Sequence, residues 1–192
     1  MYCLFEGVDT SGKSTQIALL KKRFPEAIVT KEPGGTPLGE RLREIILHHG
    51  AQSFKSELFL FLADRAEHTR EVIAPNQKKL ILSDRGFVSG IAYAMANHPD
   101  LDESFLIEQN LFALDGHLPD QVFLFLTTEE LIRQRMQTKE EDMIEKRGID
   151  YLMRVQKNME HIVKRLDLPC HYIDASDPIE AIHQNIIKGL QP

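Results

Sequence analysis

The feature that most constrains this chain is a glycine-rich loop near its start, residues 7–14, which reads GVDTSGKS. A short apolar run, residues 2–5, precedes the loop, and a helical stretch follows it. Glycines allow backbone N–H groups to curl around phosphate oxygens, and a helix that begins at such a loop directs its positive end at the same anion. The match to G-x-x-x-x-G-K-[ST] between a strand and a helix therefore predicts a nucleotide phosphate site rather than a chance glycine turn.

Two side chains of this loop have expected roles of their own. Lys13 is placed to reach the β- and γ-phosphates, and Ser14 is placed to ligate Mg²⁺. The loop alone does not decide the function of the protein, because motors, switches, transporter engines and kinases all contain such a loop. A chain of 192 residues with no second nucleotide-binding repeat favours a small kinase that carries its own acceptor site.

Short apolar runs alternate with helical periodicities along the whole chain, which is the pattern of βαβ units on a parallel sheet. The runs that we predict as strands are residues 2–5, 27–30, 79–83, 121–126 and 170–173. Each is brief and apolar, as strands buried on both faces should be. The predicted fold class is α/β, a three-layer P-loop NTPase fold with a five-stranded parallel sheet flanked by helices, and residues 1–192 are expected to form a single domain.

Two stretches place apolar residues on one helical face, and periodicity favours a core-facing position for both over a partner-binding surface. These residues are Leu38, Leu42, Ile45 and Ile46 in the first stretch, and Leu152, Val155, Met159, Ile162 and Leu166 in the second. Thr127 and Glu130 form a capping-box pattern for the helix that continues to Met136. Asp177 and Pro178 are placed to begin the last helix as its N-cap and its first-turn proline.

Residues 137–147 break this pattern, because they read QTKEEDMIEKR and have no apolar stripe. A charged segment of this kind between two helices is typical of a solvated, mobile connection. We therefore predict a short flexible lid at these residues.

The net charge of −6 argues against a general nucleic-acid-binding protein, so an anionic ligand needs a local basic site. Cys3 and Cys170 form neither a disulfide framework nor a zinc pattern. With no bilayer-length apolar stretch and no signal-peptide pattern, we expect no membrane partner and a cytoplasmic location. The eight histidines show no zinc-ligand spacing, and we expect them at surface or capping positions.

Three further segments carry motifs of a known family. Residues 30–36 read TKEPGGT after the second strand, and residues 83–85 read SDR after the third. Phe61 and Arg65 lie four residues apart on the helical stretch between them. These segments resemble the T-R-E-P-G-G-T signature, the D-R motif, and the base-stacking Phe and base-reading Arg of bacterial thymidylate kinases. With residues 86–93 included, the chain resembles this family of P-loop nucleoside monophosphate kinases over essentially its whole length.

The resemblance implies a dTMP kinase, which transfers the γ-phosphoryl of ATP to dTMP and gives dTDP and ADP in dTTP synthesis. Mg²⁺ and a homodimer are implied with it. On a helix Phe61 and Arg65 share a face, so a base can lie on the ring while the guanidinium reaches a base-edge carbonyl. Taken alone, Phe61 would be ordinary core and Arg65 a surface charge, and the motifs together reverse that preference. A strand-end ion pair is the alternative for residues 84–85.

The remaining roles are carried over residue by residue. Arg85 would grip the dTMP phosphate, Tyr93 would exclude a 2′-hydroxyl, and Asp9 would accept a hydrogen bond from the 3′-hydroxyl. The implied dTMP site is Asp9, Glu32, Pro33, Arg43, Phe61, Arg65, Arg85, Ser89, Gly90 and Tyr93. The implied ATP site is Gly7, Val8, Asp9, Thr10, Ser11, Gly12, Lys13, Ser14, Thr15, Arg135 and Ala175, and the metal ligands are Ser14 and Asp84.

The chain departs from the family pattern at several positions. Thr10 stands where some members carry a loop arginine, and Met143 stands where bacterial members tend to carry a lid arginine. The expected catalytic residues are therefore Lys13, Asp9, Arg85, Arg135 and Lys139, with Arg147 as a further choice. Lys31 stands where the family carries an arginine before E-P-G-G. Its ammonium group is a single point charge, so the two parallel hydrogen bonds of a guanidinium are not expected there. Gly90 brings no polar side chain to the thymine, which leaves Ser89 and the backbone.

Two other functions compete with this interpretation. Another nucleoside monophosphate kinase, or a deoxynucleoside kinase, would use the same phosphate loop with a different acceptor. A nucleotide-dependent switch would hydrolyse slowly and signal to a partner. Phe61, Arg65 and Tyr93 favour a thymine acceptor over both alternatives.

Overall fold

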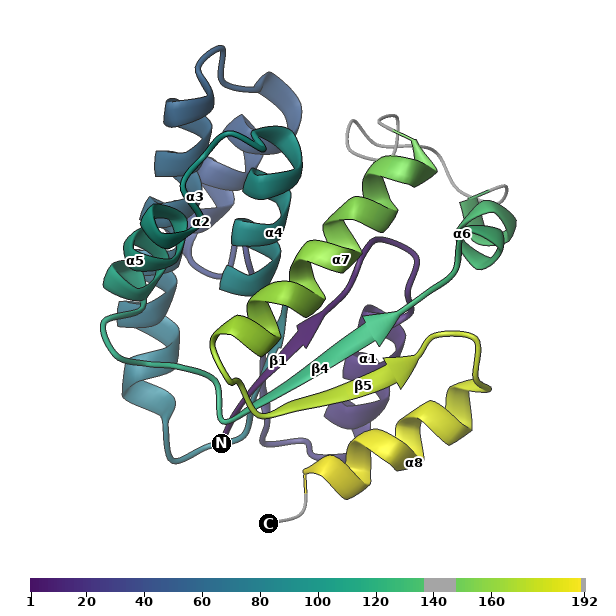
Figure 1. The fold of residues 1–192 in the computed structure, drawn as a ribbon. Helices are drawn as coiled ribbons and strands as arrows, with labels where there is room; N and C mark the ends of the chain where they lie inside the picture. Colours follow the sequence, from purple (N-terminus) through teal and green to yellow (C-terminus); the bar gives the residue numbers. More distant parts are fainter. Residues whose placement is uncertain (137–147, 191–192) are drawn as a thin grey trace.

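The computed structural model describes residues 1–136 and 148–190 (Figure 1). Five strands form one sheet in the order β2-β3-β1-β4-β5, and every neighbouring pair is parallel. The strands are β1 (Tyr2–Glu6), β2 (Ile28–Lys31), β3 (Ile81–Asp84), β4 (Gln121–Leu126) and β5 (Cys170–Asp174). The predicted five-stranded parallel α/β sheet is therefore confirmed.

Four of the strands extend one residue further at the carboxyl end than the apolar pattern predicted. The added residues are Glu6, Lys31, Asp84 and Asp174, and all of them are charged. Ligands of open parallel sheets bind at the carboxyl ends of the strands. A search for apolar runs misses these residues because they are charged. Their charges therefore mark the edge of the sheet where a ligand would bind.

Helices cover both faces of the sheet. The α-helices are α1 (Lys13–Arg23), α2 (Pro37–Glu44), α3 (Phe54–His68), α4 (Phe87–Asn97), α5 (Glu103–Leu114), α6 (Glu129–Met136), α7 (Ile149–Arg165) and α8 (Ile179–Gly189). Single π-turns follow α2 (η1, Ile45–His49) and α3 (η2, Thr69–Ile73), and a 3₁₀ turn (η3, Ala74–Asn76) leads towards β3. Among the residues that the structure describes, no helix is both long and apolar enough to cross a membrane.

Alternation along the strands separates two apolar cores. Phe5 and Phe123 point to one face, where they stack with ring centroids 5.2 Å apart beneath α1 and α8. Leu4 and Leu124 point to the other face, beneath α4 and α7, and α7 crosses the front of the sheet in Figure 1. The central strands β1, β3 and β4 are thus buried on both faces, as the short apolar runs predicted, but the prediction is wrong for the edge strands β2 and β5, where Val29 and Tyr172 are exposed.

The two predicted helical faces have different outcomes. The stripe on α7 is confirmed, because Val155, Met159 and Ile162 are fully buried. The face on α2 and η1 is wrong as a core face, since Leu38 of α2 is 43% exposed, Ile45 of η1 is 39% exposed, and the other two residues are only half-buried. The one buried residue of α2 is Gly39, which packs against the Asp64 side chain of α3. Close approach through a glycine turns the larger apolar residues of α2 towards solvent.

Two predicted helix caps also differ. The N-terminus of α6 is capped by Thr128, whose Oγ1 accepts from the Leu131 N–H at 3.2 Å, while the Thr127 N–H donates to Gln156 Oε1 at 2.9 Å. Pro178 is itself the N-cap residue of α8, and no side chain caps that helix. The predicted lid, residues 137–147, lies outside the described residues.

Candidate active site

The glycine-rich loop joins β1 to α1 at the carboxyl edge of the sheet, between β3 and β4. Gly7 has φ of 145°, and a Cβ there would lie 2.8 Å from the carbonyl oxygen of Phe125. Gly12 is the N-cap of α1 in the left-handed region, with φ of 99°. Both positions require glycine, and together they leave the N-terminus of α1 open towards a bound anion.

Lys13 is almost fully buried within this loop. Its Nζ donates to the carbonyl oxygens of Gly7 at 2.9 Å and Val8 at 3.0 Å. Burial, reinforced by the charge of Arg85, lowers the pKa of Lys13 to about 8. The lysine is thus held against the loop, beside the position that the phosphates of a nucleotide would take.

Arg85 links the loop to the neighbouring cavity. It follows β3 with a left-handed φ of 68°, its Nη2 lies 2.6 Å from Asp9 Oδ1, and its Nη1 donates to the Gly7 carbonyl at 2.8 Å. Burial alone would lower the pKa of Arg85, but Tyr93, Asp9 and Asp84 raise it overall. A permanently charged guanidinium therefore lies where the phosphate loop and the cavity meet.

The cavity lies between the E-P-G-G turn, α3 and α4, and has a volume of about 140 Å³. All ten residues of the expected acceptor site line it, from α3 and α4, the loop, the turn, α2 and the end of β3: Asp9, Glu32, Pro33, Arg43, Phe61, Arg65, Arg85, Ser89, Gly90 and Tyr93. It is lined further by residues that sequence reasoning did not identify, among them Leu47, Phe54, Asn97, Asn110 and Tyr151. Residues distant in the sequence thus share one pocket beside the phosphate loop.

Arg65 is buried at one wall of this cavity, and its geometry is fixed from two sides. Glu32 Oε2 accepts from Arg65 Nε at 3.0 Å and lies 2.9 Å from Arg65 Nη2, while Asn110 Oδ1 accepts from Arg65 Nη1. Burial would raise the pKa of Glu32, but Arg65 and His68 outweigh it and lower the pKa. Arg65 is therefore part of a buried ion pair, and a simple surface charge is excluded.

Ser89 and Arg43 are also held by specific partners. The buried carboxylate of Glu6 accepts from the backbone N–H of Ser89 at 3.1 Å and from the Ser89 hydroxyl. Burial raises the pKa of Glu6, and the bonds from Ser89 oppose this without cancelling it. Arg43 Nη1 donates to the Pro33 carbonyl at 2.9 Å, which ties α2 to the E-P-G-G turn.

The expected metal ligands are brought together at the edge of the loop. Ser14 Oγ donates to Asp84 Oδ2 at 2.9 Å. Residues 1–136 and 148–190 contain no cluster of three or more acidic, histidine or cysteine side chains that could hold a metal by itself. One hydroxyl and one carboxylate suit Mg²⁺, which prefers oxygen ligands and usually completes its shell with water and substrate phosphates.

Arg135 reaches the nucleotide side from α6. Its Nη1 donates to the Thr10 carbonyl and its Nη2 to the Ala175 carbonyl, both at 2.8 Å. It therefore connects the phosphate loop with the loop after β5, whose Ala175 is part of the implied ATP site. The other expected lid residues, Lys139, Met143 and Arg147, lie outside the described residues.

The expectation that all histidines are surface or capping residues is wrong for His68, which is fully buried behind the cavity. The sequence carried a signal for it, because residues 61, 65 and 68 recur on one helical face. Glu6 was also missed, although a charged residue ending an apolar strand before a glycine loop is a comparable signal. No such signal identified Asn110 or Tyr151, which reach the cavity only through the packing of α5 and α7.

Comparisons with known proteins agree with this geometry. A family model described as thymidylate kinase matches residues 5–186. The thymidylate kinase of Sulfurovum sp. (strain NBC37-1) is 52% identical over 191 residues, 100% of each chain, and that of Campylobacter concisus (strain 13826) is 52% identical over 97% of this chain and 96% of its own. A crystal structure of thymidylate kinase from Ehrlichia chaffeensis, 30% identical, has a TM-score of 0.76 and covers 100% of this chain and 98% of its own. Because the match extends over the whole length in both sequence and fold, this chain belongs to the thymidylate kinase family.

Proposed function

We propose that this protein transfers the γ-phosphoryl group of ATP to dTMP, giving dTDP and ADP, within a single domain. The observation that carries the proposal is the junction of the two pockets at Arg85, which lies 2.6 Å from Asp9 of the phosphate loop and also lines the acceptor cavity. A phosphate held by this guanidinium would face the nucleotide across one short gap. Such proximity is the main requirement of phosphoryl transfer.

The shape of the cavity supports thymidine monophosphate as the acceptor. Phe61 is half-buried on its wall and offers a ring on which a planar base can stack. Arg65 lies one helical turn further along α3, where an N–H group not bonded to Glu32 or Asn110 can donate to a base carbonyl. Tyr93 packs with its ring 5.8 Å from the Arg85 guanidinium, so its bulk lies near the sugar of a phosphate bound there.

The chemistry needs positioning and charge neutralisation more than a general base. In this mechanism an oxygen of the dTMP phosphate attacks the γ-phosphorus directly, with Arg85 orienting the acceptor and Asp9 accepting from the sugar 3′-hydroxyl. Lys13 and Arg135 would offset the negative charge of the transferring group. When bound at Ser14 and Asp84, Mg²⁺ would supply further charge neutralisation at the phosphates.

Incubation of the purified protein with ATP, Mg²⁺ and a panel of nucleoside monophosphates tests the proposal. We expect dTDP from dTMP, and much less diphosphate from the purine and ribose acceptors. An Arg65→Ala variant should lose dTMP phosphorylation steeply and keep its ATP affinity. Preferred phosphorylation of another acceptor, or ATP hydrolysis without transfer, would contradict it.

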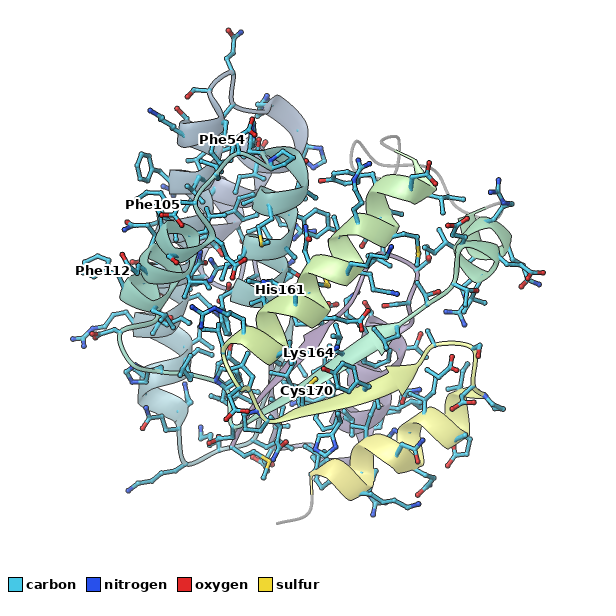
Figure 2. The ribbon with its side chains drawn as sticks, viewed as in Figure 1. Phe54, Phe105, Phe112, His161, Lys164 and Cys170 are labelled. Atoms are coloured by element: carbon cyan, nitrogen blue, oxygen red, sulfur yellow. The ribbon has the colours of Figure 1, made fainter. Side chains whose placement is uncertain are left out.

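We also propose that the protein is a homodimer. Phe59 of α3 is 57% exposed and Phe112 of α5 is 85% exposed, and they line a groove of about 570 Å³ between the two helices. Figure 2 shows Phe105 and Phe112 pointing outward from α5. Monomeric proteins rarely expose so many aromatic side chains on one surface, and a second copy would cover them isologously.

We further propose that the protein is located in the cytoplasm. The two cysteines of the chain are free, and burial raises the pKa of Cys3 to about 12. Free thiols of this kind suit a reducing compartment. The substrates ATP and dTMP would be met there.

A further inference from the structure

His68 is a fully buried histidine that the proposed chemistry does not use. It is the last residue of α3, and it is not among the residues that line the acceptor cavity. Its Nδ1 lies 2.7 Å from Glu32 Oε1, and its Nε2 lies 2.7 Å from Thr30 Oγ1. Both ring nitrogens therefore have a partner, one on the E-P-G-G turn and one on β2.

The direction of the bond to Glu32 follows from the chemistry of the partners. Glu32 is paired with Arg65, so its carboxyl group is ionised and only accepts hydrogen bonds. His68 must then carry a proton on Nδ1 and donate it to Oε1. The Thr30 hydroxyl, which can donate or accept, completes the bonding of Nε2.

Glu32 passes this constraint on to Arg65. While Oε1 is held by His68, Oε2 accepts from Arg65 Nε at 3.0 Å and lies 2.9 Å from Nη2. Asn110 holds Nη1, and its own amide is fixed by donation to the Leu106 carbonyl at 2.7 Å. A carboxylate anchored on one side only could rotate about its terminal torsion, and the guanidinium would rotate with it.

We propose that His68 is a positioning residue for acceptor recognition, because it fixes Glu32 and thereby aims Arg65 at a carbonyl oxygen on the edge of a pyrimidine base. The inference rests on the proposed function, in which the cavity holds dTMP. His68 acts through two other side chains and touches no substrate. Its loss should therefore weaken the acceptor site and leave the nucleotide site unchanged.

Two amide substitutions separate this role from simple core packing. In His68→Asn the side-chain amide nitrogen takes the place of Nδ1 and can still donate to Glu32, whereas in His68→Gln the amide reaches the place of Nε2 and this donor is lost. We expect His68→Gln to raise the KM for dTMP about tenfold, a typical cost of removing a hydrogen bond to a charged group. His68→Asn should stay near the wild-type KM, and the KM for ATP should not change in either variant.

A core variant on the other face of the sheet, Ile186→Val on α8, controls for general destabilisation and should change neither KM. Discrimination between dTMP and a monophosphate with an amino group at the same base edge should fall in His68→Gln and persist in His68→Asn. Equal KM values for dTMP in the wild type and His68→Gln would overturn the inference, as would equal losses in both amide variants.

The wild-type protein provides two further readings. Nitrogen NMR of ¹⁵N-histidine-labelled protein should show a proton on Nδ1 of His68, and an unprotonated Nδ1 would reject the inference even where the variants fail to fold. Wild-type protein that forms no dTDP from dTMP would reject the proposed function and this inference with it. Normal wild-type turnover with an unchanged dTMP KM in His68→Gln would reject this inference alone.

Discussion

At the scale of single residues, the acceptor site depends on side chains that are fixed by hydrogen bonds to buried neighbours. Arg65 is gripped by Glu32 and Asn110, and its guanidinium lies directly against Gly90 of α4. A Cβ at residue 90 would be 2.9 Å from Arg65 Nη2. The absence of a side chain at Gly90 is therefore a packing requirement of this site.

A Gly90→Ala variant tests that requirement. Alanine stabilises a helix interior relative to glycine, so α4 itself should tolerate the change. Crowding of Arg65 should raise the KM for dTMP about tenfold, in keeping with the usual cost of overpacking. Steady-state kinetics with dTMP varied will measure this, and with ATP varied the KM should remain at the wild-type value. An unchanged dTMP KM would show that Arg65 does not contact the acceptor.

The lowered pKa of Lys13 predicts a pH effect on nucleotide use. Burial favours the neutral amine, so the charged form that attracts phosphate is present below pH about 8 and is lost above it. The ratio kcat/KM for ATP, which reports ionisations of the free enzyme, should fall about tenfold per pH unit on the alkaline side. A profile that stays flat to pH values near the ordinary lysine pKa would contradict the burial argument, provided that circular dichroism shows the protein still folded.

Sequence patterns identified the residues that line the site more completely than the buried residues that hold them in place. All ten expected acceptor residues line one cavity, and all of them except Arg43 belong to segments that resemble family motifs. His68 and Glu6 were missed although their positions carried local signals, because those signals do not reveal the partners that bury them, which come from other elements. Whether such a polar side chain is buried is decided by how the elements that carry its partners pack against it, and a sequence pattern does not show this packing.

At the scale of elements, α3 holds the E-P-G-G turn at two points. His68 bonds Glu32, and one turn earlier Asp64 Oδ1 accepts from the Gly34 N–H at 2.9 Å. Burial, followed by the nearby charge of Glu32, raises the pKa of Asp64 to about 6. This raised pKa means that the folded state binds the Asp64 proton more tightly than the unfolded state does.

Asp64 therefore stabilises the fold below its unfolded pKa, and that contribution is lost as the pH rises through about 6. An Asp64→Asn variant keeps an oxygen acceptor for Gly34 without the buried charge. At pH 8 it should be more stable than the wild type, by about 3 kcal/mol. Urea unfolding at pH 8 and again at mildly acidic pH, where the difference should shrink, provides the measurement. A variant that is less stable at pH 8 would show that the carboxylate is needed there in its charged form.

Apolar patterns predicted well the elements that pack against the core. The central strands β1, β3 and β4 are buried on both faces, and α7 buries the apolar face of an amphipathic helix. The same rule failed for α2 and η1, because α2 approaches α3 through Gly39, which leaves Leu38 of α2 and Ile45 of η1 facing solvent. Periodicity shows which residues share a face, and the neighbouring element decides which face is buried.

At the scale of the whole molecule, the exposed aromatic residues of α3 and α5 predict self-association. Sedimentation equilibrium should give twice the 22.0 kDa mass of one chain for the wild type. Phe112→Asp places a charge in the centre of the proposed interface and should give the mass of a single chain. Ile179→Asp, at an exposed position on the first turn of α8, is a matched control that should remain dimeric. A wild-type protein with the mass of one chain would exclude the dimer.

The central claim is that a nucleotide site and an acceptor site face each other across Arg85 and Asp9. Calorimetric binding of one ligand that joins adenosine and thymidine through a chain of phosphates tests it most directly. The two-pocket account predicts that either excess ATP or excess dTMP displaces this ligand, and that Arg85→Ala weakens its binding. Displacement by ATP alone, with dTMP without effect, would contradict the account.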